Sequence, residues 1–375
     1  MNTWTDENTG RLVRQLTNLP EGARVPYFRW PRDLPDGRVI AFAAHASGSL
    51  IALDPASGEL EFITDPGRAR ILKFREADGW AWYYDREARE LWGRQLPNGE
   101  VRLRGRLGPE VPGEVADVTC DGRTLIGSVC ECEPSETDGL FDGDFRRFWR
   151  WIYRKRSAVI WSYDVDEARY TEVVRMPEYN PQHLDTSPVD PGLFKYAQDG
   201  LAAFDQRIHT VRVDGSEWRM VRPQVAGEWV HHEFWWPGGQ LIGYKYMDRR
   251  GDATIHQLPW GEYAPRPLQL GVANLAGEEV YLSDPLEHYH SHLDVSSNAR
   301  FATGEGTYDY GFACAAPFDM ADTRIAFQAL ATIHTPYKPA AAQGVETGVS
   351  MDNRWVIFND TVDGQMQVCA VELDL

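Results

Sequence analysis

Pro35-Asp-Gly-Arg-Val-Ile-Ala-Phe-Ala-Ala44 is a turn dipeptide followed by an apolar run, and Ser49-Leu-Ile-Ala-Leu-Asp-Pro-Ala-Ser-Gly58 is a second apolar run that ends in another turn. Asp-Gly and Ser-Gly favour tight turns because glycine adopts backbone angles that other residues avoid. Short apolar runs bounded by such turns are typical of β-strands. Together the two runs predict a β-hairpin.

This pattern recurs along the whole chain. A second clear copy joins Ser350-Met-Asp-Asn-Arg-Trp-Val-Ile-Phe358 to Met366-Gln-Val-Cys-Ala-Val-Glu372. Weaker copies begin at further turn dipeptides, which are Asp78-Gly79, Asp121-Gly122, Pro191-Gly192, Gly238-Gly239 and Ser297-Asn298. The chain therefore contains about seven units of roughly 40 to 55 residues, the repeat length expected for the blades of a β-propeller.

Each unit is expected to form a four-stranded antiparallel sheet. Such a sheet cannot bury both faces alone, but radial packing around a central channel covers both faces and leaves only short edges. Two stacked sandwich domains are the alternative, yet no Pro/Ser-rich linker or shift in composition separates two halves. We therefore predict an all-β chain in which residues 1–375 form a single seven-bladed β-propeller, in preference to six or eight blades.

Composition limits the partners and the compartment. The 375 residues carry a formal net charge of -18, so nucleic acid and anionic membrane surfaces are poor partners. The five cysteines are odd in number and lack paired CxxC spacing, which argues against a disulfide framework and a structural zinc site. The sequence shows no basic leader with an apolar run and no stretch of about 18 apolar residues. We expect a cytoplasmic protein without a membrane segment.

His288, His290 and His292 occupy every second position of one short stretch. Alternation along a β-strand would point the three imidazoles to the same side. Imidazole is the commonest metal ligand, and an approach from one strand leaves coordination positions open for a substrate. The stretch therefore indicates a metal or acid–base site, and the alternative is three solvated histidines in a polar loop.

Four other places concentrate polar residues with catalytic or ligand chemistry. They are Gln182 with His183 and Asp185, Arg207 with His209, His231 with His232 and Glu233, and Gln343 with Glu346. In a propeller, segments distant in sequence converge at the mouth of the channel, so separate blades can each contribute one residue to a single pocket. Neighbouring His231 and His232 must face opposite sides if they lie on a strand, so at most one of them faces a given site.

One segment, Phe145-Arg-Arg-Phe-Trp-Arg-Trp-Ile-Tyr-Arg-Lys-Arg156, breaks the strand pattern. It is basic and aromatic, with Phe145, Phe148, Trp149 and Ile152 at helical spacing. We predict an inter-blade helix that buries its aromatic residues, because helical aromatics are more often packing residues than ligand contacts. The alternative is a lid that binds an anionic ligand.

Several short motifs occur in the order found in one known family. These motifs are Arg14-Gln-Leu-Thr17, His183 followed by Pro188 and Pro191, Gln206-Arg207 before the turn at Asp214-Gly215, Glu228-Trp-Val-His-His-Glu233, and His292-Leu-Asp-Val-Ser-Ser297. Through them the chain resembles the oligogalacturonate lyases, which are seven-bladed propellers that cleave short pectin fragments by β-elimination. The resemblance runs through nearly the whole length.

The resemblance implies roles for individual residues. It places His232 at the position of the catalytic base and Arg207 as a second catalytic group that supplies positive charge. It also implies substrate contacts from His183 and His209. The expected substrate is a small acidic oligosaccharide.

A divalent metal, Mn²⁺ before others, is implied as well, with His292 and Gln343 among its ligands. Near the C-terminus the family carries Gln-x-x-His-x-His-Pro, whereas this chain has Gln343-Gly-Val-Glu346-Thr-Gly348, so that Glu346 replaces one histidine and Gly348 the other. A carboxylate suits manganese, so the expected site is His292, Gln343 and Glu346 with help from His290. A metal-free site is the alternative.

The implied reaction is β-elimination at a uronate, in which the metal neutralises the carboxylate and His232 removes the C5 proton. The leaving oxygen also needs a proton, from water or from an acid that the sequence does not identify. Two other functions remain open. One is a propeller that has lost catalysis and binds a glycan or a protein, and the other is an enzyme on a different uronate, which cleaves or epimerises it.

Overall fold

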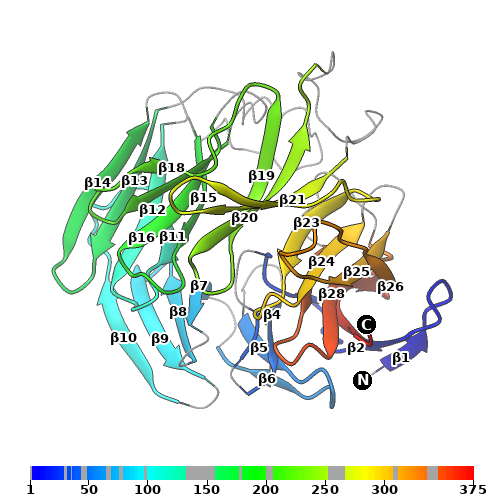
Figure 1. The fold of residues 1–375 in the computed structure, drawn as a ribbon. Coiled ribbons are helices and arrows are strands. Elements are labelled where there is room, and N and C mark those ends of the chain that lie inside the picture. Colours follow the sequence, from blue (N-terminus) through cyan, green and yellow to red (C-terminus); the bar gives the residue numbers. More distant parts are fainter. Residues whose placement is uncertain are drawn as a thin grey trace.

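The protein is described here from a computed structural model, which covers residues 2–28, 32–34, 36–43, 49–64, 69–75, 79–96, 99–131, 157–176, 180–199, 206–251, 267–306, 311–335 and 345–375. Its strands form seven antiparallel sheets arranged in a ring (Figure 1). The predicted all-β, seven-bladed propeller is therefore confirmed. The basic segment 145–156 and Gln343 lie outside the described residues.

The first six blades follow one another along the chain, each with four strands in sequence order. Blades 1 to 3 consist of β3 (Ala23–Arg24), β4 (Val39–Ala43), β5 (Ser49–Leu53) and β6 (Leu60–Phe62); β7 (Ala69–Arg75), β8 (Trp80–Asp85), β9 (Glu90–Gln95) and β10 (Val101–Arg106); and β11 (Glu114–Val118), β12 (Thr124–Cys130), β13 (Ala158–Asp164) and β14 (Arg169–Met176). Blades 4 to 6 consist of β15 (Asn180–Thr186), β16 (Leu193–Asp199), β17 (Ile208–Arg212) and β18 (Arg219–Met220); β19 (Glu228–Trp235), β20 (Leu241–Asp248), β21 (Gln269–Asn274) and β22 (Glu279–Leu282); and β23 (His290–Val295), β24 (Phe301–Gly306), β25 (Phe312–Pro317) and β26 (Gln328–Thr332).

The two ends of the chain share blade 7, which closes the ring. Its order is β27 (Thr347–Val349), β28 (Trp355–Val362), β29 (Gln365–Glu372), β2 (Leu12–Gln15) and β1 (Asn2–Thr5). Val13 pairs with Val371 in the antiparallel register between β2 and β29. Just beyond the pairing, the Thr17 hydroxyl donates a hydrogen bond to Gln367 Oε1 at 2.7 Å. Seven blades thus form a ring that is closed by backbone hydrogen bonds between β2 and β29.

The turn dipeptides identified in the sequence lead into the second strand of each blade. The quoted hairpin is β4 and β5, with Val39 opposite Leu53. Gly122, at the turn before β12, has a φ of 71°. A Cβ at this position would lie 2.4 Å from the ring of Trp82 in the preceding blade. Glycine is therefore required here both for the turn and for the close approach of two blades.

The hydrophobic core is divided among the interfaces between blades. The described residues form seven apolar clusters, one between each pair of neighbouring blades. On β28, Trp355 and Ile357 pack toward blade 1, whereas Val356 and Phe358 pack toward blade 6. Alternate residues of one strand therefore bury opposite faces of the blade, as the radial packing requires.

The described residues form strands and turns, with no helix among them. They therefore include no helix long and apolar enough to cross a membrane. The described cysteines are Cys120, Cys130, Cys314 and Cys369, and no disulfide bond joins any of them to another.

His209, which we expected to contact substrate, lies in the packing of blade 4. Its ring is stacked between Tyr196 and Trp218, with centroid distances of 5.1 Å and 5.2 Å. Trp218 Nε1 donates to the Tyr196 hydroxyl at 2.8 Å. His209 is buried, and burial lowers its pKa to about 4. It is therefore a neutral packing residue at physiological pH, because a stacked, desolvated imidazole disfavours charge.

We predict that the ring closure depends on Val13 and not on its neighbour Leu12. Val13 is 1% exposed and Leu12 is 51% exposed. Val13→Ala should lower the free energy of unfolding by about 2 kcal/mol, because it removes buried apolar surface and leaves a cavity. Leu12→Ala is the matched control and should change it by less than about 0.5 kcal/mol. Denaturant unfolding measures both, and equal losses would contradict the assignment of β2 as the closing strand.

A second prediction concerns pH. The unfolded chain protonates His209 below its ordinary pKa of 6.5, whereas the folded chain resists protonation until about 4. Its contribution to stability is therefore complete above 6.5 and is lost as the pH falls from 6.5 toward 4, by about 2 kcal/mol at about pH 5. His209→Phe keeps the stack and should flatten the fall in unfolding free energy. His288→Gln, at a half-exposed position, should keep the wild-type dependence. An unchanged dependence in His209→Phe would refute the neutral buried state.

Candidate active site

The first strands of blades 4, 5 and 6 each contain a β-bulge. The register shifts between Gln182 and Asp185 on β15, between His231 and Phe234 on β19, and between His290 and Leu293 on β23. A bulge inserts an extra residue and redirects the side chains beside it. Each of these three bulges contains a histidine: His183, His232 and His292.

The bulges bring these three histidines together, although they come from three blades. His183 and His232 have φ values of 50° and 52°, an uncommon backbone conformation that the bulges impose. The ring of His232 lies 6.5 Å from that of His183 and 4.8 Å from that of His292. Tyr27 and Phe28, which follow β3 of blade 1, complete the group, since Tyr27 lies 6.1 Å from His183 and Phe28 stacks on His292 at 5.0 Å. We call these five residues the histidine cluster.

His232 is held as a neutral base. Its Nδ1 lies 2.6 Å from the Ser291 carbonyl oxygen. A carbonyl can only accept a hydrogen bond, so Nδ1 carries the proton and Nε2 keeps a lone pair. Burial, followed by the charge of Lys245, lowers the pKa of His232 well below its ordinary value. The side chain is half-buried, and its Nε2 lone pair can accept a proton.

Lys245 strengthens this arrangement from β20. Its ammonium group donates to the same Ser291 carbonyl at 2.6 Å and to the His290 carbonyl at 3.2 Å. Burial lowers the pKa of Lys245 to about 7, although the charge of Glu305 opposes the shift. The lysine was not identified from the sequence. The local sequence offers one sign of its importance, which is a lysine placed within the largely buried strand β20.

His183 is held by a buried ion pair and not by a carbonyl. Its Nδ1 lies 2.7 Å from Glu233 Oε1, and Arg207 Nε donates to Glu233 Oε2 at 2.7 Å. Burial alone would raise the pKa of Glu233, but Arg207 and then His183 outweigh it and hold this pKa well below its usual range. The carboxylate favours positive charge on the His183 ring, whereas Arg207, whose Nη2 lies 3.4 Å from the same nitrogen, opposes it. The two histidines therefore differ in their partners, which are a carbonyl oxygen for His232 and a carboxylate for His183.

Buried ion pairs connect the strands that carry this part of the site. Lys195 on β16 lies 3.1 Å from Asp185 Oδ2 and donates to the Glu233 carbonyl at 3.2 Å. Lys73 on β7 lies 3.0 Å from both Asp185 and Asp117. Buried charges are tolerated when they are paired in this way. A polar belt therefore links blades 2 to 5 and fixes the backbone that carries His183 and Glu233.

His292 faces two buried carboxyl groups. Its Nδ1 lies 2.5 Å from Glu305 Oε1 and 3.7 Å from Glu346 Oε1. Glu305 also accepts from the His292 backbone N–H at 2.8 Å, and Glu346 accepts from the Phe28 N–H at 3.2 Å. Burial raises the pKa of Glu305 well above its ordinary value and that of Glu346 to about 8. Glu305 was not identified from the sequence, where it is one acid in a strand of small residues.

The expected alignment of His288, His290 and His292 on one side does not occur. A Cβ on Gly304 would lie 2.7 Å from His290 Nδ1, whereas His292 approaches Glu305, the next residue of β24. Neighbours on a strand face opposite sides, so the bulge has separated His290 from His292. The His290 ring packs 4.5 Å from Phe327, and neither of its nitrogens has a hydrogen-bond partner among the described residues. His288 precedes the strand.

The predicted metal site is only partly described, because Gln343 lies outside the described residues. Among the described residues no group of three His, Cys, Asp or Glu side chains is placed to hold a metal ion. Glu346 Oε1 is buried without a hydrogen-bond partner in this part of the chain, whereas His292 Nδ1 already lies against Glu305 Oε1. His290 faces away from this group. The described residues alone therefore do not form a site with the three protein ligands of a typical catalytic metal.

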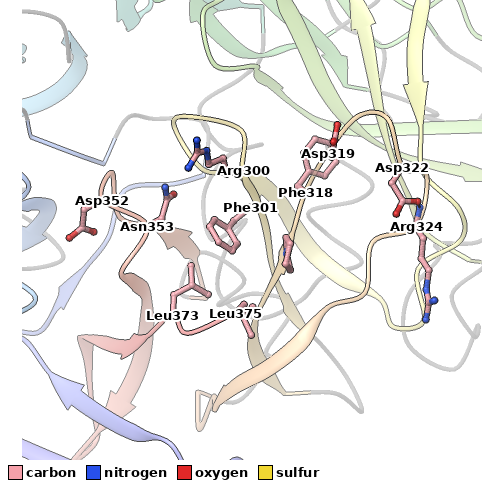
Figure 2. A pocket seen from close by; sticks show the side chains of 11 residues that line it. Arg300, Phe301, Phe318, Asp319, Asp322, Arg324, Asp352, Asn353, Leu373 and Leu375 are labelled. Carbon is pink, nitrogen blue, oxygen red and sulfur yellow. The ribbon is translucent and has the colours of Figure 1, made fainter.

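A hollow of about 650 Å³ lies elsewhere, between blades 6 and 7 (Figure 2). Its lining residues include Arg300, Phe301, Phe318, Asp352 and Leu373. None of the residues that line it belongs to the histidine cluster. Volume alone therefore does not locate the chemistry, and the candidate active site is the histidine cluster with Arg207, Glu233 and Lys245.

Comparison with known proteins identifies relatives in structure and not in sequence. No protein-family model and no curated protein matches the chain. An oligogalacturonate lyase solved in complex with manganese has a TM-score of 0.76 at 17% identity, over 99% of this chain and 96% of that one. An oligogalacturonate lyase from Vibrio parahaemolyticus has a TM-score of 0.75 at 16% identity, with the same coverage of 99% and 96%. Hydrazine synthase from Kuenenia stuttgartiensis is less similar, with a TM-score of 0.53 at 11% identity over 94% and 96%. The chain therefore has the fold of the oligogalacturonate lyases along its whole length, as its sequence motifs predicted.

Proposed function

We propose that this protein is a lyase that cleaves short uronate-containing oligosaccharides by β-elimination. The observation that carries the proposal is the state of His232, which is neutral, half-buried and oriented by the Ser291 carbonyl with Nε2 left to accept a proton. The lyases that share the fold support the same class of reaction. Because a shared fold does not imply a shared function, the argument below is made from the site itself.

The first step is removal of the C5 proton of a 4-linked uronate by His232 Nε2. This proton is weakly acidic because the neighbouring carboxylate resists further negative charge. Arg207 adds positive charge beside the histidine cluster, since its Nη2 lies 3.4 Å from His183 Nδ1. Fixed positive charge stabilises the anion that develops in the transition state. The net charge of -18 makes such a local cation necessary for an acidic substrate.

The sequence did not identify the general acid, and we assign this role to His183. Glu233 binds Nδ1, so we assign proton donation to the other ring nitrogen, Nε2. As His232 takes the C5 proton, the electron pair forms the C4–C5 double bond, the C4–O4 bond breaks, and O4 receives the proton of His183. The 6.5 Å between the two ring centres allows a base and an acid to act on adjacent carbons of one sugar. The products are an unsaturated uronate and a shortened saccharide.

Manganese has no step in this scheme, because the described residues do not provide a site for it. We place the reaction in the cytoplasm, because the five cysteines are odd in number and lack paired CxxC spacing. The alternative function is binding without catalysis. The loss of two family histidines, replaced here by Glu346 and Gly348, favours it.

Activity on saturated oligogalacturonates and glucuronate-linked oligosaccharides tests the proposal. The wild-type chain should form an unsaturated product, measured by its ultraviolet absorbance. His232→Gln should lower the rate by about 10²- to 10⁴-fold, since it removes the base. His334→Gln is the matched control, because His334 is 55% exposed and pairs with Asp360 outside the cluster. A wild-type protein that binds these saccharides without forming product would establish the binding function, and a stereoisomer as product would indicate an epimerase.

The roles of the two histidines can be separated by the leaving group. His183→Gln should be slow on a natural oligosaccharide, where O4 must be protonated as it leaves. With a nitrophenolate at C4, which leaves without a proton, the same variant should regain most of the wild-type rate. His232→Gln should stay inactive on both substrates, because each requires removal of the C5 proton. Equal impairment of His183→Gln on the two substrates would exclude its role as the acid.

A further inference from the structure

Arg32 and Gly348 form a closely fitted pair beside the histidine cluster. Gly348 lies on β27, two residues after Glu346. A Cβ built on Gly348 would lie 2.0 Å from Arg32 Cζ and 2.2 Å and 2.3 Å from its two terminal nitrogens. These distances are far below van der Waals contact. The guanidinium group therefore occupies the volume that any side chain at position 348 would need.

The partners of Arg32 come from two other blades. Its guanidinium forms an ion pair with Asp294 on β23 and donates a hydrogen bond to the Thr347 carbonyl on β27. Arg32 is only 8% exposed, and Asp294 is buried as well. A buried arginine is stable when its charge is matched and its donors are used. Arg32 thus joins the inner strands of blades 6 and 7 to the segment that leads into β4 of blade 1.

The guanidinium also lies among the acids that surround His292. Asp294 is two residues from His292, and Glu346 is two residues from Gly348. Buried acids at one point need a cation nearby. Arg32 supplies that cation from the chain itself.

We propose that Arg32 is a built-in cation that takes the place of a divalent metal in this propeller, so that the site is assembled and works without a bound metal. Three observations carry this inference. Arg32 fills the space beside β27, the bulge turns His290 toward Phe327, and Glu305 is already bound to the His292 backbone and lies 3.5 Å from the Thr347 hydroxyl. The inference goes beyond the proposed reaction, and its readouts require no substrate.

The first test is metal content. The purified chain should contain far less than one equivalent of any divalent metal by mass spectrometry, and calorimetric titration with Mn²⁺ should show no stoichiometric binding. EDTA and added Mn²⁺ should leave the unfolding temperature unchanged, because a ligand that does not bind the native state cannot stabilise it. One equivalent of Mn²⁺ in the wild type that is lost in His292→Ala would overturn the proposal.

The second test is a double-mutant cycle that needs only unfolding measurements. Gly348→Ala should lower the unfolding temperature, because the added methyl displaces the guanidinium from Asp294. Once Arg32→Met has removed the guanidinium, Gly348→Ala should cost much less, which gives a coupling between the two positions. Gly311→Ala is the matched control, since its Cβ would meet only the Ile333 carbonyl oxygen at an ordinary 3.6 Å. Additive effects would show that Arg32 does not occupy this space.

The third test restores room for a ligand. In Arg32→Ala with Gly348→His, an imidazole can stand on β27 beside His292 and Glu346, and three donors are then available. This folded double variant should bind Mn²⁺ or Zn²⁺ in a titration in which the wild type does not. A folded double variant that remains unable to bind either ion would show that Arg32 is not what closes the site. Because the assay measures binding, it is decided separately from the lyase activity.

Discussion

Each blade of this protein is apolar on both faces, and only the next blade can cover either of them. Strand alternation puts Trp355 and Ile357 on one side of β28 and Val356 and Phe358 on the other. The hydrophobic effect therefore cannot be satisfied by any open row of blades, because the two end blades would each expose one face. Pairing of Val13 with Val371 removes those ends. The inner strands are consequently held side by side, which is the condition for a site built from several blades.

The first strands of blades 2 to 6 depart from regular pairing, and three of these bulges carry the histidines. Bulges on β15, β19 and β23 put His183, His232 and His292 beside one another. Polar groups buried so deeply require partners. Those partners, among them Asp185, Lys195 and Glu233, form a belt of ion pairs under the site. The belt holds the bulged backbone in conformations that a histidine rarely adopts by itself.

Surroundings and not residue type distinguish the histidines. A carbonyl oxygen and a nearby lysine keep His232 neutral, and a paired carboxylate stabilises charge on His183. His209 is neutral for a third reason, since it is stacked between two aromatic rings. Such a separation of two neighbouring groups into one that accepts and one that donates a proton is the requirement for acid–base catalysis. Arg32 adds a fixed positive charge through its ion pair with Asp294, two residues after His292.

The repeat of turn dipeptides and apolar runs determined the fold, because turns and strand alternation depend only on residues close in sequence. The same local information identified His183, Arg207, His232 and Glu233 as chemically important, although it did not separate His209 from them. It also placed His288, His290 and His292 on one face, which holds only for an unbroken strand. Only the tertiary structure decided where the bulges fall, since a bulge is defined by pairing with another strand. It alone brought Arg32 to Thr347, 315 residues away, and to Asp294, 262 residues away. Contacts of that range depend on the closed ring, and no local pattern encodes them.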